Sequence, residues 1–246
     1  MAEEIIEQGY RELADTILEH NPGVDLGRVR AAFELADRAH SGQKRKAGTP
    51  YVTHCVAAAQ ICAEMGLDED SIVAALLHDC IEDTAITHED IARQFGGEVA
   101  DIVEGVTKLP RVQFRSREDE QMENLRKMLM AMAKDIRVII IKLADRLHNM
   151  RSLNFLSKER QQRMARETLD IYTPLAGRLG ISQIKCELED LCLKYLEPEA
   201  YEFLVENIHQ KLYERHNFVD YVVKEIKAIL DESKIEGEVF GRPKHF

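Results

Sequence analysis

The spacing of apolar residues is the feature of this sequence that most limits its fold. Along most of the 246 residues, apolar side chains recur every three or four positions, as on one face of an α-helix, and not at alternate positions as in a half-buried strand. Six prolines and thirteen glycines leave few breaks, and a chain of this length can bury one large core or two smaller ones. The sequence therefore predicts a globular, all-α protein.

The helices are expected between clusters of turn-forming residues. They cover residues 2–19, 27–39, 51–65, 68–81, 87–95, 98–107, 117–133, 136–150, 158–178, 182–195, 198–215 and 219–233. Residues 41–50 are expected to form an exposed basic loop, residues 108–117 a flexible loop, and residues 236–246 a short extended tail. The β-branched run at 138–141 would also suit a strand, but the helical spacing continues to Met150, which favours a buried helix.

Net charge and cysteine content limit the class of function. The chain has 33 Lys and Arg against 44 Asp and Glu, a net charge of −11, so we expect no direct nucleic-acid binding, and an anionic substrate must meet a local positive site. No apolar run approaches the roughly 20 residues that span a bilayer, and the acidic start is unlike a signal peptide. Five cysteines without a C-x-x-C pair suit a reducing compartment. The expected location is the cytoplasm, without membrane contact.

Four residues indicate a metal site: His54, the adjacent His78 and Asp79, and Asp145. Each lies on a predicted helix among apolar neighbours, where an unpaired polar side chain is costly. One such residue alone would more often be a hydrogen-bonded core group, but four together favour joint ligation. Two imidazoles and two carboxylates suit Mn²⁺, Fe²⁺ or Zn²⁺ better than Ca²⁺ and leave about two of six octahedral positions open, which indicates catalysis.

Two further carboxylates, Glu82 and Asp83, are expected to act beside the metal. On one continuous helix Glu82 lies four residues after His78, and Asp83 lies four after Asp79, so both project near the metal end of the same face. A carboxylate in that place can orient water or take its proton. The alternative, acids that merely decorate a helix C-terminus, is unfavourable against the helix dipole.

Other cysteines and histidines near these residues are not expected to bind the metal. Cys55 and Cys80 adjoin candidate ligands and would allow a zinc–thiolate site, but consecutive helical residues point about 100° apart, which favours core packing. His148, three residues after the last candidate ligand, is expected to support the site or the structure and not to bind the ion. His40 and His88 lie at predicted helix ends and carry no comparable signal.

In order and in context, these residues resemble the HD metal-dependent phosphohydrolases, and more closely the hydrolase half of RelA/SpoT-type bifunctional (p)ppGpp synthetase/hydrolases. The matching segments are residues 45–54, 76–84, 105–109, 127–151 and 166–191, which together cover most of residues 25–200. The pattern His-Asp-x-x-Glu-Asp-Thr at 78–84 with Lys-Leu-Ala-Asp-Arg-Leu-His-Asn-Met-Arg at 142–151 is specific, whereas a His-Asp pair alone is weak.

The resemblance implies roles for nine residues. One Mn²⁺ per chain would be bound by His54, His78, Asp79 and Asp145; Glu82 and Asp83 match the catalytic acidic pair; Arg45 and Lys46 match residues that pack against guanine; and Asn149 matches a nucleotide contact. The implied reaction removes pyrophosphate from the ribose 3′ position of guanosine tetra- or pentaphosphate (ppGpp or pppGpp), giving GDP or GTP, in the bacterial stringent response.

The resemblance also implies an organisation into domains. Residues 1–200 would form the hydrolase domain, and residues 201–246 a helical linker that leads to the start of a truncated synthetase domain. The expected partners are the alarmone and the missing synthetase and regulatory parts of the same polypeptide. Two alternatives stay open: an HD phosphohydrolase that acts on another nucleotide, and a non-catalytic regulatory module that binds the alarmone.

Overall fold

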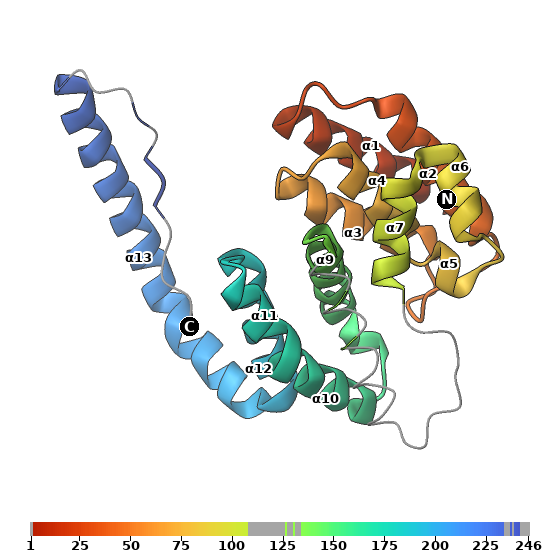
Figure 1. Ribbon diagram of the computed structural model, residues 1–246. Helices are drawn as coiled ribbons and strands as arrows, with labels where there is room; N and C mark the ends of the chain where they lie inside the picture. Colours follow the sequence, from red (N-terminus) through yellow and green to blue (C-terminus); the bar gives the residue numbers. More distant parts are fainter. Residues whose placement is uncertain are drawn as a thin grey trace. The chain divides into compact units, whose positions relative to one another are not determined.

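A computed structural model describes residues 2–107, 126, 130, 134–233, 237 and 239–241 of the chain. The chain forms two compact units, Met1–Ser157 and Lys158–Phe246. Every regular element among the described residues is a helix (Figure 1), and the one isolated pairing of extended backbone is the bridge between Lys44 and Pro50. The predicted all-α class is confirmed.

The first unit is a bundle of helices around two central ones. Its elements are α1 (Ala2–His20), α2 (Leu26–Ala39), α3 (Val52–Glu64), α4 (Glu69–Leu77), α5 (Cys80–Asp83), α6 (His88–Phe95), α7 (Gly97–Val106), α9 (Arg137–Arg151) and the 3₁₀ helix η1 (Leu153–Phe155). Helix α3 packs against α1, α4 and α9, and α4 packs against α2 and α7. Both central helices are buried over most of their length, and the polar side chains of His54 and Ser71 lie in the core.

Local sequence explains several helix starts. The side chains of Asp25 and Asp68 accept hydrogen bonds from the first turns of α2 and α4. Thr87 and Asp90 form a reciprocal capping box at the start of α6. These caps satisfy backbone N–H groups at the starts of α2, α4 and α6.

The second unit begins with α10 (Lys158–Glu167), which continues through the π-helical turn η2 (Thr168–Tyr172) into α11 (Thr173–Arg178). Pro174 lies in the first turn of α11, where its missing N–H is tolerated. Helices α12 (Ser182–Leu196) and α13 (Pro198–Glu232) complete the unit, and α12 packs against the other helices.

The bounds of the helix expected at 158–178 agree with the structure, which adds a π-helical turn within it. Two other predictions of helix bounds are wrong. The two helices expected at 198–215 and 219–233 form one, because no Gly or Pro interrupts the backbone between them. The helix expected at 68–81 ends at Leu77 and is followed by the separate turn α5.

Other predictions are confirmed or lie outside the described residues. The β-branched run is helical, within α9, as its spacing indicated. The helix expected at 117–133 lies outside the described residues except for Arg126 and Met130, which are helical, and the loop at 108–117 and most of the tail at 236–246 also lie outside them. The predicted domain boundary at residue 200 stays a prediction.

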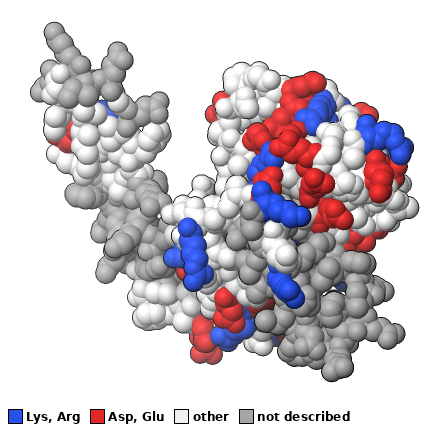
Figure 2. Space-filling model, in the orientation of Figure 1, with Lys and Arg blue, Asp and Glu red and all other residues white. Residues whose placement is uncertain are grey.

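The surface of the first unit is strongly charged. Figure 2 shows many acidic side chains, with basic ones among them, on the visible face of this unit. No helix in the part of the chain that the structure describes is long and apolar enough to cross a membrane.

Candidate metal centre

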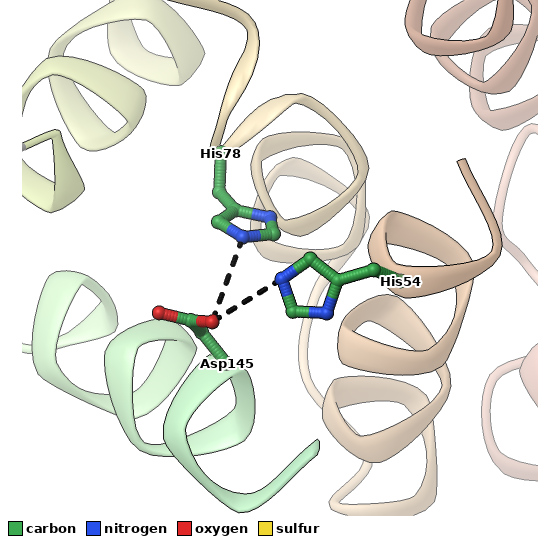
Figure 3. Close-up of side chains that lie close together, drawn as sticks. All are labelled: His54, His78 and Asp145. Carbon is green, nitrogen blue, oxygen red and sulfur yellow. Dashed lines mark ion pairs between the residues drawn. The ribbon is translucent and has the colours of Figure 1, made fainter. Parts of the chain in front are cut away.

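Three helical segments bring the four predicted ligands to one point. His54 lies on α3, His78 and Asp79 form the turn between α4 and α5, and Asp145 lies on α9. Figure 3 shows the imidazoles of His54 and His78 directed at the Asp145 carboxylate: its Oδ1 is 3.3 Å from His54 Nε2 and 3.9 Å from His78 Nε2. Asp79 Oδ2 is 3.5 Å from His54 Nε2 and 3.1 Å from His78 Nε2.

The His78 imidazole has the orientation expected of a metal ligand. Its Nδ1 lies 2.8 Å from the Ala75 carbonyl, which can accept a hydrogen bond only if Nδ1 carries the proton. Its Nε2 is buried and makes no hydrogen bond of acceptable geometry, although the Asp79 carboxylate is near. In the neutral imidazole the lone pair on Nε2 is therefore available to a cation, and the backbone carbonyl fixes the tautomer, as in many histidine–metal sites.

His54 is oriented by a second histidine. Its Nδ1 lies 2.7 Å from His148 Nδ1, and the two rings stack at 4.9 Å. Burial and the neighbouring His54 and Arg45 lower the pKa of His148 to about 3, so its imidazole is neutral. In the tautomer in which His148 Nδ1 accepts from His54 Nδ1–H, His54 Nε2 is free to bind a cation.

Asp145 is held from both sides within α9. Lys142 Nζ lies 2.9 Å from Oδ2, and Asn149 Nδ2 donates to Oδ1 at 2.5 Å. Burial alone raises the pKa of a carboxyl, but the Lys142 ammonium together with His54 and His78 holds the pKa of Asp145 well below its usual range. Asp145 is therefore ionised, and Oδ1 faces the centre.

Opposite charges also determine the ionisation of His78 and Asp79. Burial raises the pKa of a carboxyl, yet His78 and His54 hold that of Asp79 well below its ordinary value. Burial lowers the pKa of an imidazole, but Asp79 and Asp145 raise that of His78 to about 9. Two buried carboxylates thus attract a positive charge to this point, and a bound divalent cation would take that place and leave the imidazoles neutral.

The donor set fits a borderline or hard transition-metal ion. The possible ligand atoms of His54, His78 and Asp145 lie within 4.8 Å of one another. Asp79 is not part of this group of three, although its Oδ2 lies near both imidazole Nε2 atoms. Imidazole nitrogen and carboxylate oxygen suit Mn²⁺, Fe²⁺ or Zn²⁺. Cys55 and Cys80 are buried and lie outside this group; the Cys80 thiol lies 3.8 Å from His40 Nε2.

A second group of possible ligands lies on the surface. His88 Nε2 is 2.8 Å from Asp101 Oδ1 and 3.9 Å from Glu104 Oε2. The two carboxylate side chains are 77% and 61% exposed, so the contact is explained by a solvated ion pair.

The structure separates the two predicted catalytic carboxylates from the helix that carries His78. Glu82 and Asp83 are exposed on α5, so the expectation that they share one continuous helix with His78 is wrong. Asp83 nevertheless lies beside the centre, because the Tyr51 hydroxyl contacts both Asp79 Oδ2, at 2.7 Å, and Asp83 Oδ2, at 3.2 Å.

The predicted substrate residues lie on the loop before α3 and on α9. Arg45 is half-buried, and its Nη2 donates to Asn149 Oδ1 and to Ser152 Oγ, both at 3.0 Å. Asn149 in turn contacts Asp145, so a chain of hydrogen bonds connects the basic loop to a candidate ligand. Lys46 is exposed on the same loop.

Sequence reasoning missed four residues that contact the site: Lys142, Tyr51, His40 and Gln43. Lys142 had a signal, because it lies three residues before Asp145 on a predicted buried helix. The other three gave none, since their contacts join a loop to a turn that lies 28 to 40 residues further along the chain.

A family comparison agrees with this geometry. Residues 32–182 match the model of the HD domain family, a segment that contains all four candidate ligands. The chain belongs to the HD domain family.

Comparison with longer relatives and with a solved structure shows which group within the HD domain family this chain resembles. The chain is 48% identical over 236 residues to the bifunctional (p)ppGpp synthase/hydrolase SpoT of Escherichia coli, covering 96% of this chain and 34% of that protein. It is also 48% identical over 233 residues to a GTP pyrophosphokinase of Myxococcus xanthus, covering 94% of this chain and 31% of the relative. The resemblance to RelA/SpoT-type enzymes is confirmed, and the chain spans about a third of the length of these relatives.

The solved structure is described as a metazoan orthologue of SpoT that hydrolyses ppGpp. It has a TM-score of 0.50 and 27% sequence identity, and the match covers 67% of this chain and 93% of the other. Its fold supports the all-α HD architecture.

Proposed function

We propose that this chain hydrolyses the 3′-pyrophosphate of ppGpp and pppGpp, giving GDP or GTP and pyrophosphate, with one Mn²⁺ as its cofactor. The observation that carries the proposal is the buried group of two imidazole nitrogens and two carboxylates, with the His78 Nε2 lone pair directed into it. The similarity to proteins named as ppGpp hydrolases supports the choice of substrate.

In this proposal the chain's own residues divide the work. His54, His78, Asp79 and Asp145 hold the ion, which when bound supplies Lewis-acid chemistry at the phosphate. Water attacks the phosphorus that is attached to the ribose 3′ oxygen, and the bond between them breaks. The acidic pair Glu82 and Asp83 takes a proton from the attacking water, and the leaving ribose 3′ oxygen takes up a proton from solvent.

The basic loop would bind the nucleotide. Arg45 and Lys46 would pack against guanine, and Asn149 would contact the nucleotide, as in the family that the motifs resemble. The contact between Arg45 and Asn149 supports this assignment. Asn149 also donates a hydrogen bond to the proposed ligand Asp145, so a single side chain connects the guanidinium of the loop to the metal site. A planar guanidinium can stack on a purine, which an ammonium does less well.

The wider organisation is also a proposal. Residues 1–200 would be the hydrolase domain and residues 201–246 the linker to a synthetase domain, and the synthetase and regulatory parts would be its partners in the same polypeptide. The greater length of the relatives supports this arrangement. A cytoplasmic location, without nucleic-acid or membrane contact, is proposed from composition alone.

The test is to incubate the purified protein with ppGpp and Mn²⁺ and to separate the products chromatographically. We expect GDP and pyrophosphate in equal amounts, and no product after the metal is removed with a chelator. A deoxynucleoside triphosphate and a cyclic nucleotide serve as competing substrates. Faster turnover of either would support the other-nucleotide hydrolase, and tight binding of ppGpp without turnover would support the regulatory module.

A further inference from the structure

The Tyr51 hydroxyl lies between a candidate metal ligand and a candidate catalytic carboxylate. It is 2.7 Å from Asp79 Oδ2 and 3.2 Å from Asp83 Oδ2. A phenol is normally protonated near neutral pH and has one hydrogen to donate, so the two carboxylates share a single donor. The two acids lie at opposite ends of one short helix: Asp79 is the buried N-cap of α5, and Asp83 is its exposed last residue.

The position of the Tyr51 ring is determined on several sides. The ring stacks on His40 at 4.6 Å and meets the edge of His54 at 5.7 Å. Its backbone N–H donates to the Gln43 carbonyl, where the basic loop closes before α3. A ring held in this way places its hydroxyl at a defined point, because few rotamers remain accessible to it.

Asp83 has no comparable support from its own helix. Helix α5 has four residues, and the Asp83 side chain is exposed. Its backbone carbonyl accepts a hydrogen bond from Gln43 Nε2 at 3.2 Å, and the Gln43 Oε1 atom lies 3.0 Å from His40 Nδ1. Loop residues therefore hold the backbone of Asp83, while Tyr51 reaches its carboxylate.

We propose that Tyr51 is a positioning residue, which orients the ligand Asp79 toward the metal and keeps the carboxylate of Asp83 directed at the attacking water. The role toward Asp83 rests on the proposed function. The role toward Asp79 rests only on the metal site. A freely rotating acid on a short exposed helix would spend much of its time in solvent, and misplacement of a catalytic group by about 1 Å can cost 10²-fold in rate.

The experiment compares Tyr51→Phe with Tyr10→Phe. The first keeps the ring and its stacking and removes only the hydroxyl. The second removes a hydroxyl that contacts the Leu26 carbonyl on α2, at 3.4 Å, and serves as the matched control. Binding of Mn²⁺ is measured by calorimetry, and hydrolysis of ppGpp is measured at saturating Mn²⁺.

We expect Tyr51→Phe to weaken Mn²⁺ binding and to lower kcat by about 10–100-fold each, the usual effect of losing a hydrogen bond to a metal ligand. The KM should change by less than about three-fold, since the hydroxyl acts on the water and not on the nucleotide. In the Asp83→Asn background, removal of the hydroxyl should cost much less in kcat, because the carboxylate that it positions is gone. The control should match the parent in all three measurements.

The possible results distinguish failure of the proposed function from failure of either role of Tyr51. A parent that binds Mn²⁺ but does not hydrolyse ppGpp contradicts the proposed function, and the Mn²⁺ affinity of Tyr51→Phe then decides the role of Tyr51 by itself. An unchanged Mn²⁺ affinity overturns the role toward Asp79. Losses in kcat that simply multiply in the double variant overturn the role toward Asp83.

Discussion

The buried ion pair between Lys142 and Asp145 makes a quantitative prediction about stability. Lys142 Nζ lies 2.9 Å from Asp145 Oδ2, and the two side chains are 11% and 9% exposed. At an effective dielectric constant of about 20, two unit charges roughly 4 Å apart interact by about 4 kcal/mol, and breaking a buried pair by removing one partner costs about 3–5 kcal/mol. We expect Lys142→Met, which keeps most of the apolar length, to lower the free energy of unfolding by about 3–5 kcal/mol in the absence of metal.

A bound cation should reduce this loss. Asp145 also faces the point where His54 and His78 converge, so a divalent ion there would supply the positive charge that the variant lacks. The ion would also no longer be repelled by the ammonium, and its affinity should rise. A tenfold gain in affinity recovers about 1.4 kcal/mol at saturating metal.

The assay is urea unfolding followed by circular dichroism, with and without Mn²⁺. Hydrogen exchange of peptides from α3 and α9 assigns the change to the first unit. Arg38→Met is the control, because Arg38 contacts Glu34 in an exposed pair at 4.0 Å and its loss should cost less than about 1 kcal/mol. A deficit for Lys142→Met below about 1 kcal/mol, or one that Mn²⁺ leaves unchanged, would refute the electrostatic reasoning.

Three further changes test the assigned roles. Asp79→Ala should abolish metal binding and hydrolysis while the helical circular dichroism persists, since three ligands hold a labile ion poorly, and full metal occupancy would contradict the ligand assignment. Glu82→Gln should keep the metal and lower kcat by roughly 10²–10⁴; activity within a few-fold of the parent would make Glu82 structural. Arg45→Ala should raise KM more than it lowers kcat, with Lys44→Ala as an exposed control on the same loop. An unaltered KM would exclude guanine binding by Arg45, and a pure loss of kcat would place it at the leaving pyrophosphate.

Much of the fold could be predicted because helical periodicity is a local signal. The run at 138–141 shows this, since the spacing beyond it identified a helix despite its β-branched residues. Boundaries were harder, because they depend on contacts that periodicity does not contain. The π-helical turn at Thr168–Tyr172 keeps the apolar pattern of its flanks and therefore left no mark in the sequence.

The candidate ligands could be predicted because burial of four ionisable residues has few explanations. The side chains that orient these ligands could not be predicted from the sequence, except for Lys142. Lys142 shares a helix face with Asp145, and this spacing was visible. Tyr51 reaches Asp83 across 32 residues, and His54 meets His148 across 94, so only the packed fold reveals these contacts.

The break after Leu77 explains how adjacent residues can bind one ion. Side chains of consecutive residues in a continuous helix point about 100° apart, which is the reason for excluding Cys55 as a partner of His54. The same reasoning would exclude His78 and Asp79 if α4 continued through them. The backbone departs from helical geometry at Asp79, with φ −98° and ψ −4°, and its Oδ2 comes within 3.1 Å of His78 Nε2. The turn would therefore allow the proposed ligands His78 and Asp79 to bind one ion, and the helical pattern of the sequence does not reveal this turn.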